Sequence, residues 1–263
     1  MSGNRFAISI FLSMLMILGF GVGSVNAQSP PFLDLTDAKL REALQYLGFI
    51  TSKPIVAWGT IVGTKDAAVN LSEGEIVYLQ VEPTRAVKAG DRFAVLQQAQ
   101  EVIHPESRKK MGHLIVIAGE VIILGTQGGM ATARINKSFR SILVGDRIAP
   151  VPQPPADRIS IRPMKKLHGR VLLALEGTEN ITQKEIIFID RGAYHGVIVG
   201  DRFSICRPSN VSAEVIGTPK DPLPMITVGE GVVISVEEES ATALVVKSFQ
   251  AIYVGDQIVS STP

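Results

Sequence analysis

The sequence predicts an all-β protein with two tandem copies of a small barrel- or sandwich-like domain, preceded by a short helix. The chain matches itself without gaps at the offset of 110 that places Gly90 on Gly200, which indicates an internal duplication. Its apolar runs, such as EIIFID and EGVVISV, are rich in β-branched residues and are bounded by glycine or proline. The spacing between predicted turns is short, which favours barrels or sandwiches over parallel α/β sheets.

Residues 1–27 have the pattern of a signal peptide. Arg5 precedes a long apolar run, and Val25 and Ala27 provide the small residues that signal peptidase requires. We expect cleavage after Ala27; the alternative is an uncleaved anchor, because the apolar run approaches the length that spans a bilayer. The mature protein is then periplasmic or extracellular, with peripheral membrane contact at most.

Residues 33–52 contain the predicted N-terminal helix. Thr36 or Asp37 can cap its start, leucines recur at the spacing of one helical face, and Gly48 ends it. A helix of this length is unstable alone, so we expect it to pack on the first repeat or on a partner.

The two repeats are predicted at 55–150 and 169–260, separated by a proline-rich linker at 151–168. The stretch KSFRSILVGDRI at 137–148 returns as KSFQAIYVGDQI at 247–258. The matching is strongest in strand-like segments and fails between about 96 and 116, as is typical of loops that diverge after a duplication.

Four Gly-Asp pairs recur at a constant spacing of 55, each between an apolar run and the next strand. Glycine accepts a positive φ and aspartate bonds nearby N–H groups, so the pairs predict turns rather than metal ligands. The period of 55 is either an older half-repeat or a coincidence. The predicted turn residues are Gly90, Asp91, Gly145, Asp146, Gly200, Asp201, Gly255 and Asp256.

Part of the first repeat resembles a known region of exported bacterial proteins. LGFITSKPIVAWGTIVGTKDAAVNLSEGEIVYLQ, followed by VKAGDRFAVL, HPESRKKMGHLIVIAGEV and SILVGDRIAP, is similar to the β-rich region that follows the LysM module in peptidoglycan-binding proteins. The resemblance covers about residues 47–150 and, more loosely, the second repeat. More distantly, the GDRF and VGD strands look like the carboxy-terminal domain of a flagellar outer-ring protein. No LysM module fits between Ala27 and Leu47, so neither the sugar-binding function nor any site residue is carried over.

Catalytic motifs are absent from the sequence. It contains no G-x-S-x-G, no P-loop and no H-E-x-x-H, so we predict no catalytic, cofactor-binding or metal-binding residues and no cofactor. His104, Glu106 and His113 lack the paired spacing of a zinc site, and His104 and Glu106 are expected in a solvated loop. Glu120 and Glu230 could form a glycosidase pair, but their repetition fits a role in the fold better.

The remaining candidates have ordinary structural interpretations. The single cysteine, Cys206, is expected as a buried strand residue, and Trp58 and Tyr78 as core residues rather than a sugar-stacking platform. The net charge is +1, which does not support a nucleic-acid surface.

The expected function is therefore that of a non-catalytic binding or scaffolding module in the bacterial envelope, associated with an envelope protein or a cell-wall polymer. One alternative is a component of a flagellar or secretion ring; another is an enzyme that modifies peptidoglycan or polysaccharide. The helix at 37–47 or the loops between 96 and 116 are expected to carry the partner contacts, because the repeat does not constrain them. The oligomeric state stays open.

Overall fold

The computed structural model describes residues 32–34, 44, 46–65, 71–153, 156, 158–164, 167–209 and 223–260. The all-β class is confirmed. The predicted signal peptide lies outside the described residues. The described elements are β1 (Phe32–Asp34), β2 (Phe49–Thr51), β3 (Gly59–Thr64), β4 (Ile76–Val81), β5 (Arg92–Ile103), β6 (Lys110–Gln127), β7 (Met130–Ser138), β8 (Arg147–Pro150), β9 (Arg158–Ser160), β10 (Arg162–Pro163), β11 (His168–Ala174), β12 (Ile186–Ile189), the 3-10 turn η1 (Ala193–His195), β13 (Asp201–Pro208), β14 (Met225–Val236), β15 (Ala241–Ser248) and β16 (Gln257–Ser260).

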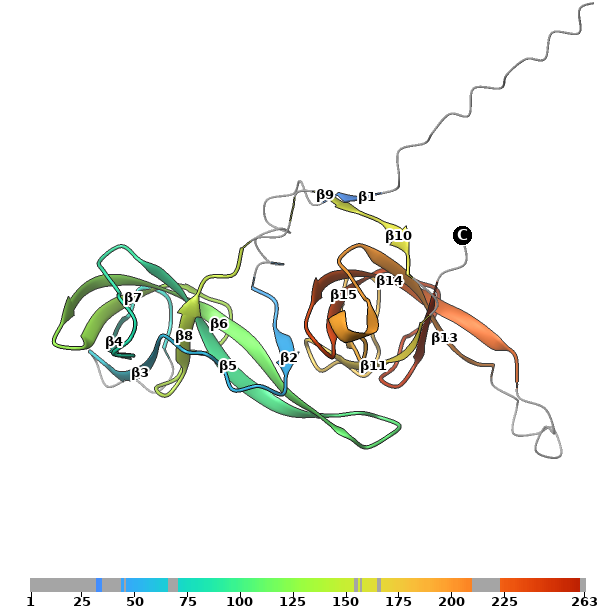
Figure 1. The fold of residues 1–263 in the computed structure, drawn as a ribbon, viewed down its shortest axis with the longest axis horizontal. Coiled ribbons are helices and arrows are strands. Elements are labelled where there is room, and N and C mark those ends of the chain that lie inside the picture. The colour runs from blue at the N-terminus through green and yellow to red at the C-terminus, as the bar shows by residue number, and fades with distance from the viewer. Residues whose placement is uncertain are drawn as a thin grey trace, which may run out of the picture.

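Strands β3 to β8 form a closed ring, and strands β11 to β16 form a second one, within the described residues (Figure 1). The first ring runs β6-β5-β8-β3-β4-β7 and returns to β6; the second runs β14-β13-β16-β11-β12-β15 and returns to β14. Each strand of the second ring occupies the place of its repeat counterpart in the first ring. The two repeats therefore have the same strand order.

The finer period in the sequence also has a structural basis. A shift of 55 places β3, β4 and β5 on β6, β7 and β8, and every pairing in the first ring is preserved. The pair Phe93–Pro150 becomes the pair Val95–Ile148 under this shift, and both pairs are present in the register of β5 with β8. Each barrel is thus a two-fold arrangement of two three-stranded units.

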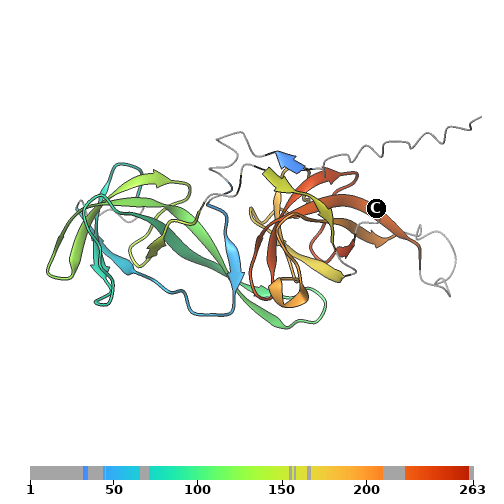
Figure 2. The same ribbon diagram turned by 45° about the horizontal axis from the view of Figure 1, so that its top comes forward.

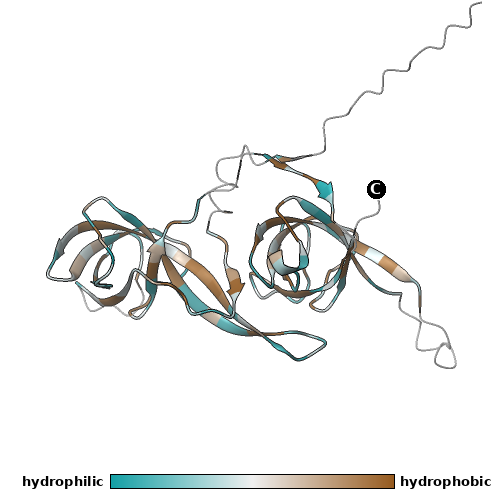
Figure 3. Ribbon diagram, viewed as in Figure 1, coloured by the Kyte–Doolittle hydropathy of each residue, from teal (hydrophilic) through white to brown (hydrophobic). Residues whose placement is uncertain are grey.

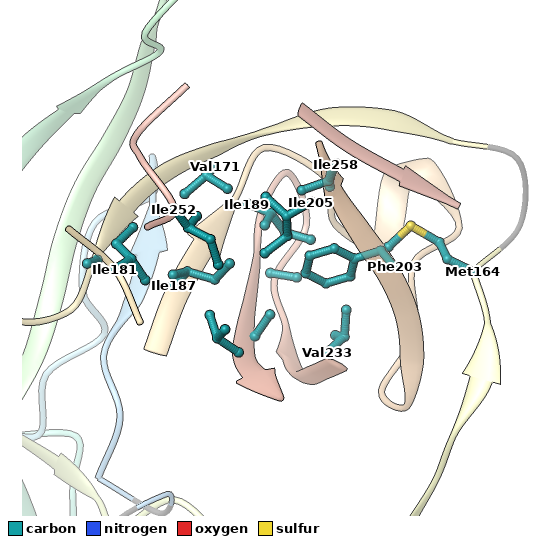
Figure 4. Packing of buried hydrophobic residues seen from close by; sticks show 14 of the residues in the cluster. Met164, Val171, Ile181, Ile187, Ile189, Phe203, Ile205, Val233, Ile252 and Ile258 are labelled. Carbon is teal, nitrogen blue, oxygen red and sulfur yellow. The ribbon is translucent and has the colours of Figure 1, made fainter. Parts of the chain in front are cut away.

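Alternating side chains fill the interior of each barrel. Figure 4 shows the second core, where Phe203 lies among the side chains of Ile205, Ile258 and Val233. A Cβ at Gly231 would meet the Phe203 ring at 2.4 Å, so this glycine makes room for the largest core side chain. Figure 3 shows the corresponding hydrophobic strands in both barrels.

The predicted N-terminal helix needs correction at both ends. Residues 32–34 form β1, which pairs with β9, and residues 49–51 form β2, which pairs with β6. Leu44 and Tyr46 between them are buried, and residues 35–43 and 45 lie outside the described residues. Strand β2 was missed because it is short and its strand partner, β6, is distant in sequence.

The linker also contains more sheet structure than its prolines indicate. Residues 158–160 and 162–163 form β9 and β10, and β10 runs parallel to the start of β13. Pro163 is tolerated there because it lies on an edge strand of the sheet. In the part of the chain that the structure describes, no helix is long and apolar enough to cross a membrane.

Candidate functional site at the junction of the barrels

The four Gly-Asp pairs share one turn geometry. Each glycine has a φ between 92° and 102°, and each is the third residue of a four-residue turn. The aspartate N–H donates to the carbonyl three residues earlier, and the carboxylate accepts the N–H of that same residue at 2.9–3.0 Å. These residues close the turns that start β5, β8, β13 and β16, as the turn interpretation requires.

The β5–β6 hairpin extends well beyond the first barrel and lies against the second (Figures 1 and 2). Its outer part covers much of the region where the sequence repeat fails. Partner contacts were expected here, and the contacts that the structure shows are with the second barrel of the same chain. The expected solvated loop is therefore wrong for His104, which contacts Asp190 and has a nearly buried side chain.

Apolar packing forms one part of this junction. Ile50 on β2 and the hairpin side chains Val102 and Leu114 pack against Leu172 and Phe188 of the second barrel. Strand β2 lies between the barrels, and a hydroxyl group of the second barrel bonds to it: Ser240 Oγ donates to the Ile50 carbonyl at 3.2 Å. All five of these apolar side chains are buried, so the hairpin and β2 are integral parts of the fold.

A polar cluster around Asp190 forms the other part. The Arg170 N–H donates to Asp190 Oδ1 at 2.6 Å, and Arg191 Nη1 donates to Oδ2 at 2.7 Å. His104 Nδ1 accepts the N–H groups of Glu106 and Ser107, so its Nε2 carries the proton and donates to Asp190 Oδ2 at 3.0 Å. The buried carboxylate is thereby fully engaged.

A second ion pair joins the hairpin tip to the barrel. The Arg170 guanidinium donates through Nε and Nη2 to the two oxygens of Glu106, at 3.0 and 2.9 Å. Its Nη1 donates to the Gly255 carbonyl at 3.1 Å, which links the Arg170–Glu106 ion pair to one of the four Gly-Asp turns. Arg170 is mostly buried whereas Glu106 is exposed, so the pair closes the rim of the junction.

These groups line a cleft of about 490 Å³ between the hairpin tip and the second barrel. The cleft brings together three of the four histidines, two of which the sequence analysis did not associate with His104. Ser107 Oγ accepts the Lys109 N–H, and His104 is engaged on both ring nitrogens, so Ser107 and His104 are not arranged for nucleophilic attack. Within the described residues, no three His, Cys, Asp or Glu side chains are placed so that they could hold a metal ion. The polar lining of the cleft includes His104, Glu106, His168, Arg170, Asp190 and His195.

The repeated glutamates lie in different barrels and do not form a pair. Glu120 is fully buried and accepts the Tyr46 hydroxyl at 2.7 Å, both Arg92 nitrogens at 2.8 Å and the Asn136 amide at 2.7 Å. Burial and this bond to Glu120 raise the pKa of Tyr46 to about 12. Glu230 accepts from Arg202 at the equivalent position. Both glutamates anchor arginines beside β-bulges, which is a role in the fold.

The other candidates separate into core and surface residues. Cys206 is a buried strand residue, and Trp58 packs against the first core with its ring 5.5 Å from that of Phe93, as expected. His113 bonds to Gln98 on the hairpin. Tyr78, however, is exposed, so the expectation that it belongs to the core is wrong.

Tyr78 is the centre of a surface feature that we call the apolar row, which consists of Val62, Tyr78 and Leu124. Pairing brings it together: Val62 lies at a bulge opposite Tyr78, Tyr78 pairs with Thr132, and Leu124 lies at a bulge opposite Thr132. The exposed fractions are 46% for Val62, 37% for Tyr78 and 45% for Leu124.

The second barrel has a matching set at the repeat-equivalent positions, which we call the buried row: Leu172, Phe188 and Ile234. The bulges and pairings are the same, but the exposed fractions are 3%, 0% and 7%. Leu172 and Phe188 are covered by β2 and the β5–β6 hairpin, and Ile234 packs with Leu44 and Ile159. The same row is thus covered on one barrel and open on the other.

Sequence reasoning missed the junction because its two sides are far apart in the chain and differ between the repeats. One signal was available. Asp190 ends the apolar run EIIFID, where the first repeat has Gln80, and a lone carboxylate after a buried strand indicates a specific partner. No protein-family model matches the chain, and a search of curated proteins finds no match.

Proposed function

We propose that the protein is an exported, non-catalytic binding and scaffolding module of the bacterial envelope. The observation that carries this proposal is the apolar row on the first barrel. Three large apolar side chains are exposed on β3, β4 and β6, with Thr132 of β7 between Tyr78 and Leu124, whereas the corresponding side chains of the second barrel are buried by protein. Groups of exposed large apolar side chains are typical of protein-interaction sites.

The junction cleft supports a structural role better than a catalytic one. Two of its carboxylates, Asp190 and Glu106, are engaged in the junction. Asp190 pairs with Arg191 and accepts from His104 of the hairpin, and Glu106 of the hairpin pairs with Arg170 of the second barrel. A glycan- or peptide-cleaving site requires carboxylates that face a substrate with free lone pairs. The cleft therefore favours rigid docking of the two barrels.

Retention on envelope material tests the proposal. The protein, as its host produces it, is incubated with purified cell-wall sacculi and with envelope extract and then sedimented. Tyr78→Glu places a charge at the centre of the apolar row, and we expect it to reduce retention at least about tenfold, because a buried unpaired charge opposes association. Val56→Glu is the matched control, since Val56 is 70% exposed and lies outside the row.

Equal retention of the wild type and the Tyr78→Glu variant would remove the row as the binding surface. Hydrolysis of glycan or peptide by the purified protein would overturn the non-catalytic assignment. A circular dichroism spectrum and a urea transition for each variant show whether the barrels remain folded.

A ring component is the second candidate function, and the apolar row also favours it. The internal repeat relates the apolar row to the buried row, which is already covered by β2 and the β5–β6 hairpin. A subunit of a ring needs a surface of this kind to bind the next subunit.

A further inference from the structure

We propose that copies of this chain associate head to tail, the second barrel of one copy docking on the apolar row of the next. The inference rests on the proposed scaffolding role and specifies its partner as a second copy of the same chain. Inside one chain, the first barrel already docks on the second through its β5–β6 hairpin and β2. The proposed contact continues that same interface beyond the end of the chain.

The receiving surface is the apolar row. Val62, Tyr78 and Leu124 have the same bulges, pairings and neighbours as the three residues of the buried row. The backbone geometry beneath the buried row is therefore repeated on the first barrel, with Gly63 and Lys65 in place of Leu173 and Leu175 of the covered surface. Each of these side chains is already more than half buried in one chain, and docking removes the remaining exposed apolar surface from water.

The docking surface is at the base of the β13–β14 hairpin, and we call residues 223–226 the docking edge. The β13–β14 register reproduces that of β5 with β6: Cys206–Thr227 corresponds to Leu96–Ile117, and Pro208–Met225 to Gln98–Ile115. Leu114 and Val116, which pack on the second barrel, correspond to Pro224 and Ile226.

The docking edge is partly open in the described part of one chain, since Ile226 packs against the core of its own barrel. Pro224 and Met225 are exposed, whereas Leu114 and Ile115 at the same positions of β6 are buried. Strand β2 pairs with residues 113–115 of β6, but β9, its counterpart by position, pairs with β1 instead. Residues 225–227 of β14 therefore keep an unpaired strand edge beside the exposed apolar residues, within the described residues. Figure 1 shows that this hairpin points away from the first barrel.

The two surfaces are different and lie on different barrels, so their contact is heterologous. A heterologous contact repeats from copy to copy and produces a closed ring or an open filament, according to the rotation between neighbours. Asp190 and Arg170, which make the polar contacts of the junction, are replaced on the first barrel by Gln80 and Thr60. We therefore expect the contact between copies to be weaker and more apolar than the junction within one chain.

Sedimentation equilibrium of the protein as its host produces it tests this inference. Measurements extend to about 1 mM for the following reason. Within one chain the two barrels are linked, so each meets the other at a millimolar effective concentration, and a contact with a millimolar dissociation constant is sufficient to hold them together. We expect concentration-dependent growth beyond the dimer for the wild type and for the control Val56→Glu. Tyr78→Glu blocks the apolar row, and the double variant Pro224→Glu/Met225→Glu blocks the docking edge. Each variant alone should remain monomeric, with association weakened at least about thirtyfold.

An equimolar mixture of the two blocked variants gives the sharpest result. Tyr78→Glu keeps an intact docking edge and the double variant keeps an intact apolar row, so the mixture should form a one-to-one dimer and nothing larger. Val62→Glu and Leu124→Glu replace Tyr78→Glu if that variant loses its wild-type urea transition.

A wild type that remains monomeric at about 1 mM would overturn the inference, as would a mixture that fails to dimerise or a blocked variant that assembles normally by itself. Retention on envelope material by a monomeric wild type would refute self-association alone, and the binding function would stand.

Discussion

At the scale of the residue, the four Gly-Asp turns explain why the chain repeats the same short segment. In each turn the glycine provides a left-handed φ and the aspartate carboxylate binds the first N–H of the turn. These two requirements were predictable from the sequence, because few other residues meet either of them.

Gly145→Val should destabilise the protein by about 1–3 kcal/mol, because a β-branched residue is strained at a φ of 102°. A Cβ at Gly145 meets nothing within 4 Å, so the cost arises from the backbone alone. Gly125→Val is the matched control: Gly125 has the same open surroundings without a left-handed φ. Urea unfolding measures both variants, and equal midpoints would contradict the turn interpretation.

Tyr46→Phe should lower the free energy of unfolding by about 1.5–3 kcal/mol, because the buried Glu120 carboxylate loses a donor. Folding raises the pKa of Tyr46 from 10.0 to about 12, so its contribution is complete below pH 10 and is lost as the pH rises through that window. Urea unfolding of both proteins from neutral pH to about pH 11 should show a decreasing difference. A constant difference would argue against this coupling.

At the scale of the element, the β5–β6 hairpin determines how the barrels are joined. The sequence match between the repeats fails in this segment, and the side chains of its outer part do differ from those of the second repeat. It did not predict that His104 and Glu106 contact the other repeat, because hydrogen bonds over such separations leave no local pattern. The sequence also did not predict that the β5–β6 and β13–β14 hairpins share the same register at their bases, because the side chains there have diverged.

Asp190→Ala should destabilise the protein by about 3 kcal/mol, because it removes the buried carboxylate that holds His104, Arg191 and the Arg170 N–H. Glu106→Ala breaks only the exposed ion pair with Arg170 and should cost less than about 1 kcal/mol. Hydrogen exchange locates the effect: the amides of residues 100–112 should lose protection in Asp190→Ala and largely keep it in Glu106→Ala. Similar protection in both variants would show that Asp190 does not hold the hairpin.

At the scale of the whole molecule, the duplicated barrel was predictable because strand and turn residues follow the shift of 110. The two-fold relation within each barrel was left open, and the strand pairings establish it. The apolar row was not predictable. Tyr78 and Phe188 occupy the same position in barrels of the same strand order, but β2 and the β5–β6 hairpin cover only Phe188.

This difference makes position 78 the most direct place to test self-association in the living cell. A photo-crosslinking amino acid at position 78 is activated in the host, and mass spectrometry identifies the peptides joined to it. The account predicts adducts of twice the mass of the chain, with the attached peptides from residues 201–236 of a second copy. The absence of an adduct, or adducts only with other proteins, would contradict head-to-tail assembly through the apolar row.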